Sequence, residues 1–245
     1  MMPRSKLLTQ ASLHRSFDLL TLVSYHKMGR CIRMKSILCY GDSNTWGYIP
    51  AKGGRYPRNI RWPGRLEEYL GCGYHVIEEG LCGRTTCYQI PLEPSRNGYD
   101  TFPMILESTA GADLVILMLG TNDRRTQLCV SPQESALALE RYLRLLHAPA
   151  LWSAERVPEV LLIAPPVIDE CVMQREAGFY YGEKSVADSH CLAAEYQLLA
   201  KKYNCAFLNA AEVCTPSQED GVHLDEQGHQ RLAEAVFQII RENSR

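Results

Sequence analysis

The sequence predicts a single α/β domain, built on a parallel sheet with helices on both faces. Short apolar segments alternate with longer segments of helical periodicity, which is typical of β–α–β units. A chain of 245 residues with 46% hydrophobic residues can bury one large core. Five short apolar segments, bounded by Gly, Pro, Asn or Asp, are predicted strands: Ser36–Tyr40, His75–Glu78, Leu114–Leu119, Val160–Ala164 and Ala206–Leu208.

Four longer segments are predicted helices: Trp62–Leu70, Pro132–His147, Val186–Tyr203 and Asp225–Asn243. The second has a clear start, with Ser131 as N-cap, Pro132 at the first position and Glu134 three residues after the cap. Two long irregular segments, 80–100 and 165–185, are expected to carry function, as long loops in compact α/β domains often do.

The first 33 residues have a different character from the rest. They are basic, lack strand–helix alternation, and carry a short apolar cluster at Leu19–Val23. That cluster is short for a signal-peptide core, and no small-residue cleavage site follows it. Met34 then opens directly on the first strand, like a natural start. We therefore expect an extension outside the fold at 1–33 and the domain at 34–245; a weak amphipathic helix in the extension is the alternative.

Composition excludes several classes of protein. The formal net charge of −2 offers no field to attract nucleic acid or an anionic membrane. No stretch approaches the roughly 18 apolar residues of a membrane helix. The ten cysteines are scattered and form no C-x-x-C motif, so reduced thiols and a cytoplasmic location are expected, without nucleic acid or membrane as partners.

Polar and glycine-rich clusters follow four of the five predicted strands. Parallel sheets bind ligands at the carboxyl ends of their strands, so these clusters are expected to share one edge. They are Gly41-Asp42-Ser43-Asn44-Thr45, Gly80-Leu81-Cys82-Gly83-Arg84-Thr85-Thr86, Gly120-Thr121-Asn122-Asp123 and Asp220-Gly221-Val222-His223.

A nucleophile and its base are predicted within these clusters. Ser43 follows a strand through Gly41, which lets the chain turn sharply and expose the hydroxyl. Among the seven histidines, His223 alone lies in a loop after a strand with a carboxylate, Asp220, three residues before it. That spacing allows Asp220 to fix the tautomer that accepts the serine proton. The alternatives are a helix-capping role for Ser43 and a turn role for Asp220.

An acyl-transfer site also needs hydrogen-bond donors for an oxyanion. The Ser43 N–H, the backbone N–H at Gly83 and the side-chain amide of Asn122 are the candidates. In the alternative interpretation, the Gly120–Asp123 segment is an ordinary turn. Each cluster is a weak signal alone. The four clusters that contain Ser43, Gly83, Asn122 and His223 each follow their own strand, and together they indicate one site.

These four blocks resemble those of the SGNH (GDSL-type) hydrolase family: G-D-S, a glycine after the second strand, G-x-N-D, and D-x-x-H near the end. The resemblance covers about Lys35 to the C-terminus. It extends to a bacterial arylesterase/acyltransferase-like branch through G-D-S-N-T-W-G-Y-I-P (41–50), R-W-P-G (61–64) and V-I-E-E-G-L-C-G-R-T-T (76–86). One departure is Asn44, where the family often has leucine; the catalytic residues do not use that side chain, but pocket shape can change.

The resemblance implies a flavodoxin-like fold and an esterase that works through an acyl-serine, with Ser43, Asp220 and His223 as catalytic residues. It implies no metal, no organic cofactor and a small-molecule ester as partner, and it allows for a homo-oligomer whose neighbouring subunits narrow the entrance. No G-x-S-x-G motif is present, so the α/β-hydrolase fold is excluded.

Substrate preference is predicted from residues near Ser43. Trp46, Tyr48 and Trp62 are expected to wall a narrow pocket, with core packing an equal alternative for Trp62. The resemblance implies a preference for short acyl chains and aryl esters. The residues support it, because the expected rim segments, 51–58 and 93–98, are polar and no apolar lid is recognisable. A lipase or carbohydrate acetylesterase of the same family is the alternative, followed by a non-catalytic flavodoxin-like binding module.

Overall fold

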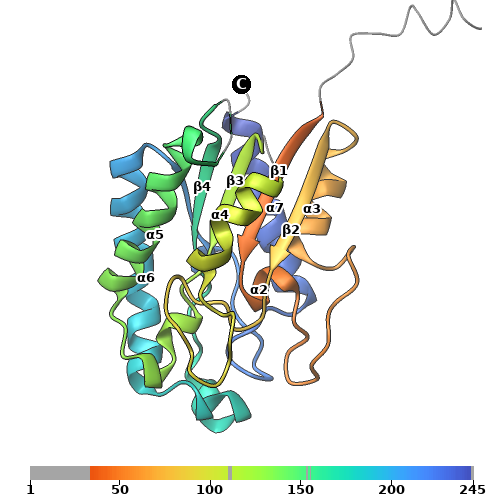
Figure 1. Cartoon of the computed structure of the whole chain (residues 1–245). Helices are drawn as coiled ribbons and strands as arrows, with labels where there is room; N and C mark the ends of the chain where they lie inside the picture. The colour runs from red at the N-terminus through yellow and green to blue at the C-terminus, as the bar shows by residue number, and fades with distance from the viewer. Residues whose placement is uncertain (1–33, 110–111, 153, 155, 244–245) are drawn as a thin grey trace, which may run out of the picture. The chain divides into compact units, whose positions relative to one another are not determined.

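A computed structural model describes residues 34–109, 112–152, 154 and 156–243. The extension expected at residues 1–33 lies outside this part of the chain. Five parallel strands form one sheet in the order β2-β1-β3-β4-β5 (Figure 1). They are β1 (Lys35–Gly41), β2 (Tyr74–Gly80), β3 (Leu114–Met118), β4 (Glu159–Ala164) and β5 (Ala206–Asn209). This confirms the predicted fold class, and the strand order is that of flavodoxin-like domains.

Helices cover both faces of the sheet (Figure 1). α4 (Gly98–Ser108), α5 (Pro132–Leu146) and α6 (Glu183–Tyr203) pack on one face, whereas α3 (Trp62–Leu70) and α7 (Glu226–Asn243) pack on the other. Successive strand residues alternate between the two cores, as the pleat requires. In β3, for example, Val115 and Leu117 face α4, α5 and α6, and Ile116 and Met118 face α3 and α7.

The predicted strands and helices match the observed elements closely, but two helices escaped prediction. α2 spans only Ser43–Trp46, too short to show a hydrophobic period. α4 begins at Gly98 and contains Pro103, and both residue types disfavour a helix interior. Its formation is explained by packing, since Phe102 and Leu106 are completely buried in the core.

A buried histidine links α7 to α3. His229 is 0% exposed, and its Nδ1 accepts a hydrogen bond from the Trp62 backbone N–H at 3.4 Å. Burial, reinforced by the charges of Arg65 and Arg61, lowers the pKa of His229 to about 3. The imidazole is therefore neutral in the folded chain throughout the physiological range.

We expect His229 to make the protein lose stability as pH falls from about 6.5 toward 3. In that window the unfolded chain binds a proton at this histidine that the folded chain does not, so the free energy of unfolding decreases with falling pH. Urea unfolding at a series of pH values should give a shallower pH profile for His229→Asn, even if that variant is less stable at neutral pH. Identical slopes in the two proteins would contradict this assignment.

Candidate active site

The end of β1 places Ser43 at the carboxyl edge of the sheet. α2 starts at Ser43, and Asp42 caps it by accepting the Asn44 N–H at 2.9 Å. A Cβ on Gly41 would lie 2.0 Å from Thr45 Oγ1, so only glycine lets α2 fold back this tightly onto the strand. Burial raises the pKa of Asp42 to about 6, against the backbone hydrogen bond from Asn44 and the charge of His223. The turn predicted at Gly41 is thus present and presents Ser43 to the edge.

Ser43, His223 and Asp220 form a hydrogen-bonded row. His223 Nδ1 donates to Asp220 Oδ2 at 2.7 Å, which leaves Nε2 to accept from Ser43 Oγ at 2.9 Å. The backbone N–H groups of Val222 and His223 donate to Asp220 Oδ1, each at 2.9 Å. Burial alone would raise the pKa of Asp220, but its hydrogen bond to His223, the charge of that ring and the backbone N–H groups lower it. Asp220 therefore stays ionised and fixes the tautomer of the imidazole.

Asn44 links the loop that carries His223 to α2, the helix that begins at Ser43. Its Nδ2 donates to the Val222 carbonyl at 3.2 Å, and its Oδ1 accepts from the Leu224 N–H at 2.9 Å. These two contacts, which we call the Asn44 clasp, lie on either side of His223, and the Asn44 side chain is buried. The family's usual leucine has no group that could make either bond, so the departure noted in the sequence sets the position of the loop rather than the pocket wall.

The loop after β2 and the loop after β3 are held together by buried polar contacts. Asn122 Nδ2 donates to the Arg84 carbonyl at 3.1 Å. The Asp123 carboxylate accepts from the N–H of Thr86 at 2.8 Å, from its hydroxyl at 2.7 Å and from the Ser135 hydroxyl of α5 at 2.7 Å. Gly83, with φ of +78°, stands at the turn of the first loop. The Gly120–Asp123 segment is therefore more than a turn, because it anchors its neighbouring loop.

All of the predicted catalytic and oxyanion residues line one pocket of about 310 Å³. Ser43, Gly83, Asn122, Asp220 and His223 are brought together there from the first, second, third and last blocks of the sequence.

The predicted aromatic wall is only partly in place. The ring of Tyr48 lines the pocket, with its centroid 4.4 Å from that of His223. Trp62 does not reach the pocket, because α3 turns it into the core between the sheet, α3 and α7, where it is 0% exposed. Trp46 does not line the pocket either; its ring lies under the Arg55 guanidinium, 5.3 Å from the centroid. For Trp62 the structure matches the core-packing alternative, and for Trp46 it corrects the expectation that this ring walls the site.

Several pocket residues were not identified from the sequence. The polar rim at 93–98, the cluster after the second strand and the long loop at 165–185 contain all of them except Arg125, but no pattern marks the individual side chains. They are Cys82, Glu93, Arg96, Arg125, Glu176, Tyr180 and Tyr181. Burial raises the pKa of the Cys82 thiol to about 11, so this group stays protonated beside the serine.

Two exposed apolar side chains lie next to pocket residues in the sequence, outside the segments expected to form the polar rim. Phe179, at the end of the 3-10 helix η5 (Glu176–Phe179), is 85% exposed, and Leu92 is 94% exposed. Each is next in the sequence to a residue that lines the pocket, Tyr180 and Glu93 respectively. Isolated apolar side chains of this kind do not form the continuous surface that a lipid interface requires.

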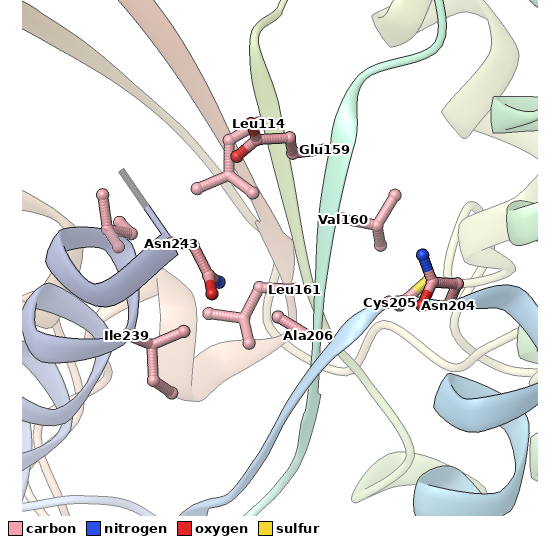
Figure 2. Close-up of a pocket in the computed structure, with 10 residues that line it drawn as sticks. Leu114, Glu159, Val160, Leu161, Asn204, Cys205, Ala206, Ile239 and Asn243 are labelled. Carbon is pink, nitrogen blue, oxygen red and sulfur yellow. The ribbon is translucent and has the colours of Figure 1, made fainter. Parts of the chain in front are cut away.

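A second cavity, of about 380 Å³, lies at the opposite edge, where β3, β4 and β5 begin and α7 ends (Figure 2). Leu161 and Ile239 lie on one side of β4, with Val160 and Cys205 on the other (Figure 2). Burial raises the pKa of Cys205 to about 11. The lining holds no serine or histidine, so within the described residues this cavity offers no comparable pair of nucleophile and base.

The parallel sheet, with a serine, a histidine and an aspartate hydrogen-bonded in sequence at its carboxyl edge, has the arrangement of a serine hydrolase. The GDSL-like lipase/acylhydrolase family model matches residues 39–231, and the chain belongs to this family.

Solved structures agree with this assignment. The M. smegmatis aryl esterase is 32% identical, with a TM-score of 0.80 over 85% of this chain and 99% of that one. A carbohydrate acetylesterase from Sinorhizobium meliloti is 34% identical, with a TM-score of 0.77 over 85% of this chain and 99% of that one. No curated protein matches the sequence. The protein is a serine esterase that hydrolyses carboxylic esters. No helix in the described ranges is long and apolar enough to cross a bilayer.

Proposed function

We propose that Ser43 is the nucleophile, His223 the general base and acid, and Asp220 the residue that orients and balances the imidazole. The observation that carries the proposal is the hydrogen-bonded row, at 2.9 Å from Ser43 Oγ to His223 Nε2 and 2.7 Å from His223 Nδ1 to Asp220. A serine hydroxyl becomes nucleophilic only when a neighbouring base accepts its proton, and this geometry supplies that base.

The oxyanion is assigned to the Ser43 N–H, the Gly83 N–H and the Asn122 side chain. A carboxamide nitrogen carries two hydrogens, and the Arg84 carbonyl takes one of the Asn122 pair. The second is the donor proposed for the oxyanion. The backbone at Gly83 has a positive φ, which a residue with a Cβ rarely adopts. Glycine also lets a ligand approach the backbone closely, which is what a donor N–H at this position requires.

The reaction follows from these roles. Ser43 Oγ attacks the ester carbonyl carbon while its proton moves to His223 Nε2, giving a tetrahedral oxyanion. The intermediate collapses, the C–O bond to the alcohol breaks, and His223 protonates the departing oxygen. Water then attacks the acyl-serine, again giving its proton to His223, and collapse of the second intermediate returns that proton to Ser43 Oγ and releases the acid.

Small acyl groups are proposed as the preferred substrates. The pocket of about 310 Å³ is at the lower end of the range for ligand sites, and three charged side chains, Glu93, Arg96 and Arg125, form part of its wall. Arg96 and Arg125 are both ion-paired with Glu93, and a long alkyl chain would displace water from these charged groups without adding a hydrogen bond to them. An acetyl group, whether on an aryl or on a sugar hydroxyl, places little apolar surface against them. The cytoplasmic location and a homo-oligomer remain predictions from the sequence and the resemblance.

We expect kcat/KM to be highest for the shortest acyl chains in a series of p-nitrophenyl esters from acetate to palmitate. Each added methylene should lower it beyond about butyrate, because the pocket is small and part of its wall is charged. Activated esters also hydrolyse spontaneously, so Ser43→Ala protein at the same concentration is the matched blank. An acetylated sugar in the same assay tests the carbohydrate ester separately. A maximum at octanoate or above would instead support the lipase alternative.

A further inference from the structure

Tyr181, just before α6, touches the proposed oxyanion donor. Its hydroxyl donates to Asn122 Oδ1 at 3.2 Å, and both side chains are almost fully buried. Burial raises the pKa of Tyr181 to about 12, with Arg125 acting in the opposite direction. The phenol therefore keeps its proton, and the contact to Asn122 has the tyrosine as donor.

Arg125 lies beside this contact. Its guanidinium is paired with the carboxylate of Glu93 and lies 4.7 Å from the ring centroid of Tyr180. Its charge acts to lower the pKa of Tyr181, but burial has the larger effect and raises it. The phenolic hydrogen is therefore retained and is donated to Asn122 Oδ1.

An asparagine side chain can sit in two orientations that differ only by exchange of its oxygen and nitrogen. Here Tyr181 offers a hydrogen to one end of Asn122, and the Arg84 carbonyl accepts one at the other. Rotating the amide by half a turn would set Nδ2 against the phenol hydrogen and Oδ1 against a carbonyl oxygen, so both contacts would become repulsive. The two partners therefore permit only the orientation with the nitrogen toward Arg84.

We propose that Tyr181 is a positioning residue, which acts through Asn122 to hold and polarise the oxyanion-hole amide. This inference rests on the proposed role of Asn122. A hydrogen bond accepted at Oδ1 withdraws electron density from the amide, so the N–H groups at the other end become better donors. The gain is largest when the substrate oxygen carries full negative charge, so it is greater in the transition state than in the bound ester.

A double-mutant cycle tests the proposal. Tyr181→Phe removes only the hydroxyl and keeps the ring that fills the space. We expect it to lower kcat for p-nitrophenyl acetate roughly tenfold with a smaller change in KM, as for loss of one hydrogen bond that matters in the transition state. In a background that already carries Asn122→Ala, the same substitution should change kcat less than about twofold, because its target is gone.

Tyr203→Phe is the matched control. It also removes one tyrosine hydroxyl, which donates to Glu140 on α5 at 2.8 Å, far from the site in the fold, and kcat should be unchanged. Equal losses from Tyr181→Phe in both backgrounds, or an effect confined to KM, would overturn the positioning role. If Asn122→Ala alone retained full kcat, the proposed oxyanion hole would fail first, so the two failures are distinguishable.

Discussion

Replacing Ser43 by alanine is expected to lower kcat for p-nitrophenyl acetate by roughly 10⁴- to 10⁶-fold. The acyl-serine cannot form without the hydroxyl. The residual activity comes from direct attack of water on an ester that is bound in the pocket and held by the oxyanion donors. Among the described residues the Ser43 hydroxyl hydrogen-bonds only to His223, so the fold should survive the change. Thermal unfolding of the purified variant checks this.

His223→Ala should cost about as much as Ser43→Ala, and the double variant little more than either, because the serine and its base act as one unit. His190→Ala is the matched control, since this histidine is exposed on α6 and belongs to no part of the site. Labelling by an organofluorophosphonate should disappear in Ser43→Ala. Wild-type turnover by purified Ser43→Ala protein would sink the assignment of the nucleophile.

Asn122→Ala should lower kcat by roughly 10²–10³ with a much smaller change in KM. The amide is proposed to bind the oxygen only after it becomes negatively charged, so its loss is felt mainly in the transition state. The same variant should slow inactivation by a phosphonate ester, whose phosphoryl oxygen enters the same position.

An Asn122→Ala effect seen only in KM would make this side chain a substrate-binding group. Asn122 also contacts Arg84 and Tyr181, so its removal could loosen the two loops. Asp123→Asn serves as the comparison, because Asp123 fastens the same loops through Thr86 and Ser135 but does not line the pocket. A kcat loss as large in that variant would indicate loop displacement rather than a missing donor.

The sequence was sufficient for the fold because each core strand is short, apolar and bounded by turn residues. α4 could not be predicted from the sequence because Gly98 and Pro103 disfavour a helix. The helix is explained by the packing of Phe102 and Leu106 in the core. Local preference is a weak guide wherever tertiary burial decides.

The grouping of Ser43, Asp220 and His223 was predictable because all parallel strands end at one edge, so residues just after them must meet. The pocket wall was not. Trp62 is near Ser43 in the sequence, which suggests a place in the pocket wall. Side chains on a helix point in all directions around its axis, however, and the Trp62 side chain points into the core. Tyr181 lies in a long loop without periodicity, so its contact with Asn122 depends on a path that no local pattern encodes.

The Asn44 clasp ties together segments separated by 178 and 180 positions in the chain. Ser43 is translated before His223 and before α7, which follows that histidine. A chain that ends before His223 therefore has the Ser43 hydroxyl but lacks the His223 imidazole. It also lacks the backbone groups of Val222 and Leu224 that hydrogen-bond Asn44. Such long-range closure comes late in folding, since the entropy of the intervening chain has to be overcome first. Ester hydrolysis can consequently serve as a readout of chains that extend beyond His223 and are folded.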